Sequence, residues 1–93
     1  MPAAARLNDP TTGHGCFPST VLNSASSNVI INGKGSVRLK DTIESHCCVS
    51  CHSDEVSAAA SKVFVNGRNK ARVGDPISCG DAIKSGSGNV FVN

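Results

Sequence analysis

Aromatic residues are scarce in this 93-residue sequence, which contains three Phe and neither Trp nor Tyr. A core must therefore come from Val, Ile, Leu and Ala, and it will be thin, because a chain of this length buries only roughly 60–65% of its unfolded surface. Long apolar runs are also missing, so no segment is expected to span a membrane as a helix. Residues 1–6 lack the apolar stretch of a secretory signal peptide, and we expect none.

Charge of one sign is not in large excess either. Nine Lys and Arg face seven Asp and Glu, a formal net charge of +2, and the basic residues are dispersed along the chain. This balance argues against a nucleic-acid partner, which would favour a basic patch and stacking aromatics. A G-x-S-x-G motif is absent, and the neighbours Cys51 and His52 are a poor nucleophile–base pair, since such pairs are usually distant in sequence. The sequence therefore predicts a protein that is not an enzyme.

Cysteine and histidine, by contrast, are plentiful, with five Cys and three His. Small domains with thin cores are often stabilised by disulfides or by a metal ion. A chain without a signal peptide is made in the cytosol, where clustered Cys more often indicate a metal or redox site than structural disulfides. We therefore expect a metal or redox site here.

Three short segments indicate a threefold internal repeat. They are β-branched or aromatic runs bounded by polar residues, a strand pattern, at 28–32, 62–66 and 89–93. Asn32-Gly33 and Asn66-Gly67 follow the first two segments, and Asn-Gly favours the tight turn of a β-hairpin.

A second repeated element is Arg-x-x-Asp, which occurs as Arg6–Asp9, Arg38–Asp41 and Arg72–Asp75. These pairs are interpreted either as solvated surface charge or as ion pairs that stabilise a repeated turn. The first unit lacks its opening strand and an extra strand lies at residues 89–93, so the chain reads as three circularly permuted units. We predict an all-β, single-domain protein over residues 1–93, without an effector extension: a small cone of three pseudo-threefold-related, hairpin-like repeats.

The repeat register also predicts a metal site. His14 and His46 each lie five residues after a repeated Asp, and Cys79 lies four residues after the third. Equivalent positions converge near the axis of a cone, and a closed structural zinc site needs a fourth ligand. His52 is the predicted fourth ligand, with Cys48 or Cys51 as alternatives. These N and S donors favour one structural Zn²⁺ ion near the apex.

Two of the candidate ligands also have a simpler interpretation. His14, between two glycines, could be a surface turn residue, and Cys79 could be a small buried apolar residue. Cys16 and Cys47 are interpreted as packing residues. Cys48-Val49-Ser50-Cys51 matches C-x-x-C, so a dithiol redox protein is an alternative function.

Several stretches resemble the PAAR-repeat family of spike-tip proteins. Residues 2–9, Pro-Ala-Ala-Ala-Arg-Leu-Asn-Asp, resemble the Pro-Ala-Ala-Arg signature, and Thr12-Gly13-His14-Gly15 resembles the family's first His turn. Residues 66–76 resemble a second copy, and Cys79-Gly80 followed by residues 86–90 resembles its C-terminal end. The resemblance spans essentially the whole chain. It departs from the pattern at residues 35–41, a copy without Pro or the Gly-Asp pair.

The resemblance implies a pointed cone with one zinc ion near its apex, held by three His and one Cys. Its broad base would bind the blunt end of a trimeric β-helical spike, either a VgrG-type spike of a type VI secretion system or the central spike of a contractile phage tail. The strands around residues 29–31, 63–65 and 90–92 would lie nearest that base. The implied function is a structural, membrane-piercing tip that contacts the target membrane transiently.

The implied location follows from that function. The tip would assemble in the bacterial cytoplasm and leave on the spike, or belong to a phage tail baseplate, with any effector recruited non-covalently. The alternative function is a free-standing zinc-binding adaptor for another trimeric protein.

Overall fold

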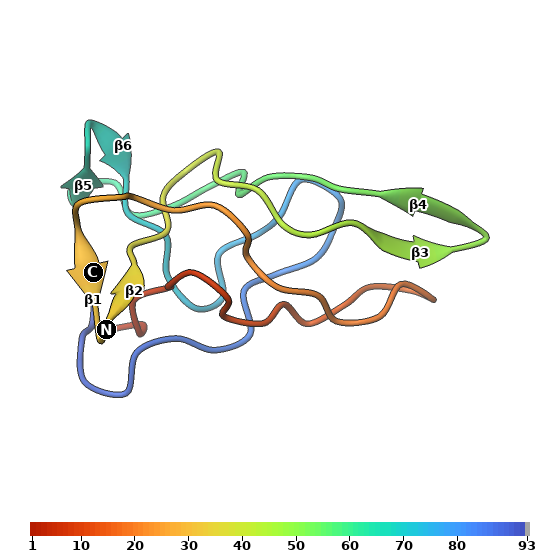
Figure 1. Ribbon diagram of the computed structural model, residues 1–93, viewed down its shortest axis with the longest axis horizontal. Helices are drawn as coiled ribbons and strands as arrows, with labels where there is room; N and C mark the ends of the chain where they lie inside the picture. Colours follow the sequence, from red (N-terminus) through yellow and green to blue (C-terminus); the bar gives the residue numbers. More distant parts are fainter. Residues whose placement is uncertain (93) are drawn as a thin grey trace.

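The computed structural model describes residues 1–92 and confirms an all-β chain, in which no described residue is helical (Figure 1). Within residues 1–92, three two-stranded antiparallel sheets form: β1 (Ile30–Ile31) with β2 (Lys34–Gly35), β3 (His46–Cys48) with β4 (Ser50–His52), and β5 (Phe64–Val65) with β6 (Arg68–Asn69). Accordingly, the described residues contain no helix that could cross a membrane.

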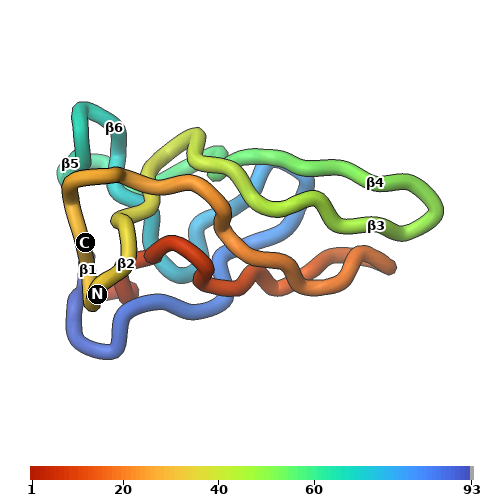
Figure 2. Tube along the Cα trace, in the orientation of Figure 1, coloured from red at the N-terminus to blue at the C-terminus, as the bar shows by residue number. Residues whose placement is uncertain are grey.

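The molecule is elongated, with principal extents of 36 × 24 × 22 Å. One end, called the base below, holds β1, β2, β5 and β6 (Figure 1). At the opposite, narrow end the β3–β4 hairpin projects furthest. Figure 2 shows the chain travelling from the base toward the narrow end and back three times, once for each repeat.

The two Asn-Gly turns form at the base as predicted. Asn32 and Gly33 have φ angles of 52° and 79°, and Asn66 and Gly67 have φ angles of 54° and 77°. Asn and Gly are the residues that adopt these left-handed conformations at least cost. The turns set the register of the β1–β2 and β5–β6 hairpins.

The C-terminal segment pairs with the start of the chain, as the circular permutation predicts. Ala3 and Phe91 form an antiparallel bridge, and the backbone N–H of Val92 donates to the Pro2 carbonyl at 2.8 Å. Asn93, the last residue of the predicted strand, lies outside the described residues.

A closed ring of backbone hydrogen bonds joins the three units. The N–H of Val37 donates to the Ala5 carbonyl at 3.2 Å, that of Ala71 to Val37 at 3.0 Å, and that of Ala5 to Ala71 at 3.2 Å. Each unit therefore donates to one neighbour and accepts from the other, which leaves no open edge within the ring.

Small aliphatic residues fill the core, as the composition requires. The same pairing recurs in each unit: Leu22 bridges Ile43, Val56 bridges Ile77, and Ile83 bridges Thr11. All six side chains are buried, and five of them are apolar. The threefold repeat therefore builds one continuous core from short segments.

The Arg-x-x-Asp pairs close three equivalent turns and are not solvated surface charge. In all three pairs the backbone N–H of the Arg donates to Oδ2 of the Asp at 2.7 Å, and its guanidinium also bonds the carboxylate. All three carboxylates are buried. The residue before each Asp has a positive φ, namely 71° at Asn8, 72° at Lys40 and 92° at Gly74. The shared conformation shows that the degenerate second copy keeps the same turn.

Candidate metal centre

The four predicted ligands meet at the narrow end of the molecule. His14 lies in a tight turn in which its N–H donates to the Phe17 carbonyl at 3.1 Å and Phe17 donates back at 2.8 Å. His46 on β3 and His52 on β4 are cross-strand partners. Cys79 lies in the corresponding turn of the third unit, beside Gly80 with a φ of 102°.

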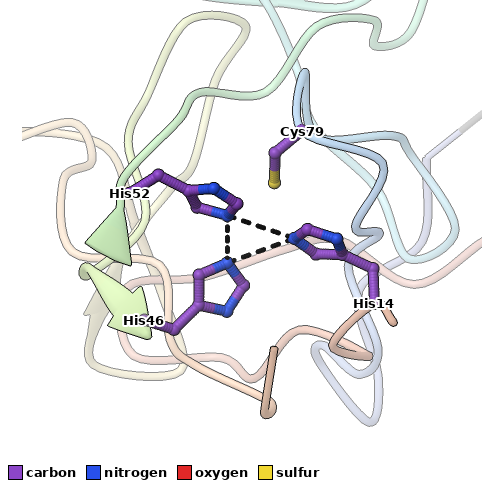
Figure 3. Close-up of side chains that lie close together, drawn as sticks. All are labelled: His14, His46, His52 and Cys79. Carbon is purple, nitrogen blue, oxygen red and sulfur yellow. Dashed lines mark hydrogen bonds between the residues drawn. The ribbon is translucent and has the colours of Figure 1, made fainter. Parts of the chain in front are cut away.

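Their ligand atoms converge on one point (Figure 3). One donor atom from each of the four residues lies within 4.8 Å of every other. The Nε2 atom of His46 lies 2.7 Å from that of His52, and Nε2 of His14 lies 3.3 Å and 3.1 Å from the two. In the described part of the chain, no other group of three or more His, Cys, Asp or Glu side chains is placed to hold an ion.

The donor chemistry fits a borderline-soft cation such as Zn²⁺. The Nδ1 atom of His46 lies 2.8 Å from the Pro18 carbonyl oxygen, which can only accept, so Nδ1 carries the proton and Nε2 presents a lone pair to the cluster. A backbone carbonyl behind a ligating imidazole is the usual second-sphere partner in metal sites. Burial raises the pKa of the Cys79 thiol, so it is protonated at neutral pH unless a cation displaces the proton.

Phe17 covers this cluster and was not predicted from the sequence. Its ring stacks on His52 with centroids 4.2 Å apart, on His14 at 4.8 Å, and lies 5.1 Å from His46. An apolar cover lowers the local dielectric around a bound cation. Its only sequence signal is its position three residues after His14 in the same turn.

Asp81 also escaped the sequence reasoning, although it joins two of the ligand-bearing turns. Its Oδ1 atom accepts from Gly13 N–H and from Thr12 Oγ1, both at 2.8 Å. Asp81 lies two residues after Cys79, and Gly13 precedes His14, so the carboxylate holds those ligands side by side. The signal available in the sequence was its position next to the Cys79-Gly80 turn.

The cysteine interpretation was wrong in three respects. Cys16 pairs with Cys48 and Cys47 pairs with Cys51 in disulfides, so Cys16 and Cys47 are not packing residues. Cys48 and Cys51 do not form a C-x-x-C pair with each other. The expectation of reduced thiols fails for these four, and Cys79 is the free cysteine among the described residues.

The β3–β4 hairpin explains these pairings. Cys47 is the cross-strand partner of Cys51, while the neighbouring Cys48 points to the other face of the hairpin, because successive residues of a strand alternate. With both sulfurs in disulfides, neither Cys48 nor Cys51 presents a thiolate to the cluster, whereas the ring of His52 lies beside His14, His46 and Cys79 (Figure 3).

The fold and this site define a small, threefold-pseudosymmetric β tip with a cluster of three His and one Cys at its narrow end. A family model described as the PAAR motif matches residues 17–85, well over half of the chain. The chain therefore belongs to the PAAR-motif family, whose members are structural spike-tip proteins of contractile injection systems. His14 and the first Arg–Asp pair lie outside the matched span. No curated protein gives a significant sequence match.

Proposed function

We propose that this chain is a membrane-piercing tip, formed as one domain over residues 1–93, that caps the trimeric β-helical spike of a contractile injection apparatus. The spike would be VgrG-type in a type VI secretion system, or the central spike of a phage tail. On this proposal the tip is assembled in the bacterial cytoplasm, or on a phage baseplate, and leaves with the spike.

The base carries this proposal, because it exposes the same apolar surface three times. Val29, Val63 and Val90 are each 37% exposed, and their neighbours Ile30, Phe64 and Phe91 are 55%, 57% and 51% exposed. A surface of this kind repeated about a pseudo-threefold axis suits a partner with true threefold symmetry. The base therefore supports a trimer as the partner, bound in the ratio of one tip to three spike chains.

The strands at the base support the same partner through their backbones. β1 and β5 are only two residues long and belong to two-stranded sheets, so their outer edges have free hydrogen-bonding groups. The blunt end of a β-helix presents unpaired backbone groups as well. Edge-to-edge stacking of the two would satisfy both sets, as in β-strand addition.

At the narrow end, His14, His46, His52 and Cys79 are proposed to hold one structural Zn²⁺ ion. Phe17, beside this cluster, is only half-buried, so packing alone covers the end of the molecule incompletely. Four protein ligands complete a tetrahedral zinc shell and leave no open position for a water nucleophile. This geometry supports a structural role for the metal and no catalysis.

The base is tested by charge substitution. Purified tip is mixed with a recombinant VgrG-type spike trimer, and co-elution is measured by size-exclusion chromatography with light scattering. Ile30→Asp/Phe64→Asp is expected to abolish co-elution, because two charges would be buried unpaired. Val49→Asp is the matched control: Val49 is a fully exposed apolar residue at the opposite end, in the β3–β4 turn. Co-elution that survives at the base, or is lost equally in the control, would contradict the proposal.

The metal is tested separately by elemental analysis of the purified protein. One zinc per chain is expected in the wild type, and none in His14→Ala or Cys79→Ala. Ser50→Ala, an exposed β4 residue next to Cys51, serves as the control that keeps its zinc. Stoichiometric zinc in both ligand variants would sink the proposed centre. If the tip holds zinc but binds no spike trimer, a free-standing zinc adaptor becomes the better function.

A further inference from the structure

The narrow end carries two disulfides that differ in what they connect. Cys47–Cys51 closes a short loop within the β3–β4 hairpin, with a sequence separation of 4. Cys16–Cys48 joins the His14 turn of the first unit to β3, across a separation of 32. Only the second disulfide therefore links two units of the repeat.

The Cys16–Cys48 disulfide joins the His14 turn to the β3–β4 hairpin, and together they carry three of the four clustered ligands. Cys16 lies two residues after His14, and Cys48 lies two residues after His46 on β3. Positions two apart on a strand face the same side, so Cys48 shares the face of His46. Cys47, on the other face, pairs across the hairpin with Cys51.

Polar contacts already hold the other two junctions around the cluster. Asp81 binds the His14 turn, as described above, and thus ties the third unit to the first. Ser78 next to Cys79 donates to Asp54 Oδ1 at 2.9 Å, two residues beyond His52. The third junction, between the His14 turn and the ligand-bearing part of the hairpin, has the hydrogen bond between His46 and the Pro18 carbonyl. It also has a covalent link, the Cys16–Cys48 disulfide.

We propose that the Cys16–Cys48 disulfide presets the metal centre, so that the oxidised chain binds its metal ion more tightly than the chain lacking this bond. This inference rests on the metal centre proposed above. Three imidazole Nε2 atoms from three segments of the chain lie 2.7–3.3 Å apart, so these side chains must lose conformational freedom to bind one ion. A cross-link that holds His14 beside β3 lowers this cost before the ion arrives, which is preorganisation.

Reciprocity follows by linkage: the bound ion must favour the disulfide by the same factor. Oxidation needs an acceptor, for which a low-molecular-weight disulfide serves. The Cys16 and Cys48 thiols form one S–S bond, and their two electrons and two protons convert the acceptor into two thiols. A chain made in a reducing compartment would thus gain metal affinity after entering an oxidising one.

The test compares two variants that each lose one disulfide from the same end of the molecule. Zn²⁺ affinity is measured without reductant, by competition with a chromophoric chelator, for Cys16→Ser/Cys48→Ser and for the control Cys47→Ser/Cys51→Ser. We expect one zinc per chain in both. Affinity should fall roughly 10- to 100-fold in the first, the range seen when an outer-sphere support is removed. It should change less than about threefold in the control.

Equal affinities in the two variants would overturn the coupling alone. Failure of the oxidised wild type to bind Zn²⁺ would overturn the metal centre, and this inference with it. A second measurement avoids substituting Cys16 or Cys48, in case that variant does not fold. In the Cys47→Ser/Cys51→Ser background, the fraction of Cys16–Cys48 disulfide is trapped by alkylation in a glutathione buffer, with and without Zn²⁺. The ion should raise that fraction; an unchanged or lower fraction would also overturn the proposal.

Discussion

The Nζ atom of Lys70 lies 2.6 Å from the carbonyl oxygen of Ala5, a residue 65 positions away in the sequence. It also donates to the Val37 carbonyl at 3.0 Å, so this ammonium sits against the backbone ring that joins the three units. Lys70 is only 2% exposed. The equivalent residues before the other ring positions are Ala4 and Ser36, so the buried cation is a feature of the third unit alone.

The first prediction concerns the pH dependence that Lys70 creates. Burial lowers the pKa of Lys70 to about 8, against the attraction of Asp9, Asp41 and Asp75. Because the unfolded chain then binds more protons between pH 8 and 10.5, the free energy of unfolding should rise over that window, by about 3 kcal/mol. Lys70→Met should remove this rise and unfold with similar or greater stability at pH 7. Denaturant titrations at several pH values measure the effect.

A matched control for Lys70 is Lys62→Met, since Lys62 is exposed. It should keep the wild-type rise. Differences between variants isolate Lys70, because the raised pKa of Cys79 contributes equally to all three proteins. A rise that persists in Lys70→Met would show that the ammonium is not its source.

The second prediction concerns the carboxylate of the second Arg–Asp turn. Burial alone would raise the pKa of Asp41, but hydrogen bonds from Arg38 and Ser24 outweigh it and lower the pKa. Asp41→Asn should cost about 2–4 kcal/mol at pH 7, because it removes the charge and one of the two acceptor oxygens that bind a partly buried guanidinium and a backbone N–H. Glu44→Gln removes an exposed charge and should be nearly neutral.

The pH dependence of Asp41 has the same sign as that of Lys70 but lies in the acid range, because both groups have a lowered pKa in the folded state. A lowered pKa in the folded state adds stability above the unfolded pKa of about 3.9, and this contribution is lost as the pH falls through the folded value. Below pH 4, the free energy of unfolding of the wild type should therefore fall more steeply than that of Asp41→Asn. Parallel acid profiles would argue against the inferred role of the carboxylate.

The third prediction concerns removal of the metal. With free Zn²⁺ at about 1,000 times its Kd, binding adds about 4 kcal/mol, and each kcal/mol shifts the Tm of a domain this size by about 4–8 °C. Chelation should then lower the Tm by about 15–30 °C, and added Zn²⁺ should restore it. His52→Ala should melt low with or without chelator. Calorimetry without reductant measures the Tm. An unchanged Tm after chelation would show that a metal ion does not stabilise the fold.

The fourth prediction concerns two nearby glycines. A Cβ at Gly86 would collide with the Ala4 carbonyl oxygen and approach its carbon to 3.0 Å, whereas a Cβ at Gly88 would meet nothing within 4 Å. Gly86→Ala should therefore cost about 1–3 kcal/mol, since the backbone must shift, and Gly88→Ala should be neutral or slightly stabilising. Chemical denaturation of both variants checks this. Equal stabilities would show that the contact with the first unit can relax freely.

The repeated features could be predicted because they are local. Asn32-Gly33 and Asn66-Gly67 determine their turns through their own backbone preferences, so the hairpins at the base follow from adjacent residues. The register of His14, His46 and Cys79 follows from the repeat in the same way, and the structure brings these residues together with His52. As a ligand set they remain a prediction until metal is measured.

The support around the cluster could not be predicted, because it joins residues distant in sequence. Phe17 covers His52 and Asp81 binds Gly13 only after three separate turns reach the narrow end. The sequence around Lys70 gives no sign that this lysine is buried, because its hydrogen-bond partner Ala5 lies in another unit of the repeat. None of these side chains belongs to a motif that recurs in all three units.

The amino-acid sequence by itself determined the threefold β architecture, the turns and the family, because each depends on short patterns repeated along the chain. Only the tertiary structure decided which cysteines pair. The adjacent residues Cys47 and Cys48 lie on opposite faces of the β3–β4 hairpin, which was not predicted from the sequence. Cys16, which pairs with Cys48, belongs to another unit of the repeat. Disulfide pairing depends on which side chains face each other in space, and the positions of five cysteines in the sequence do not contain that information.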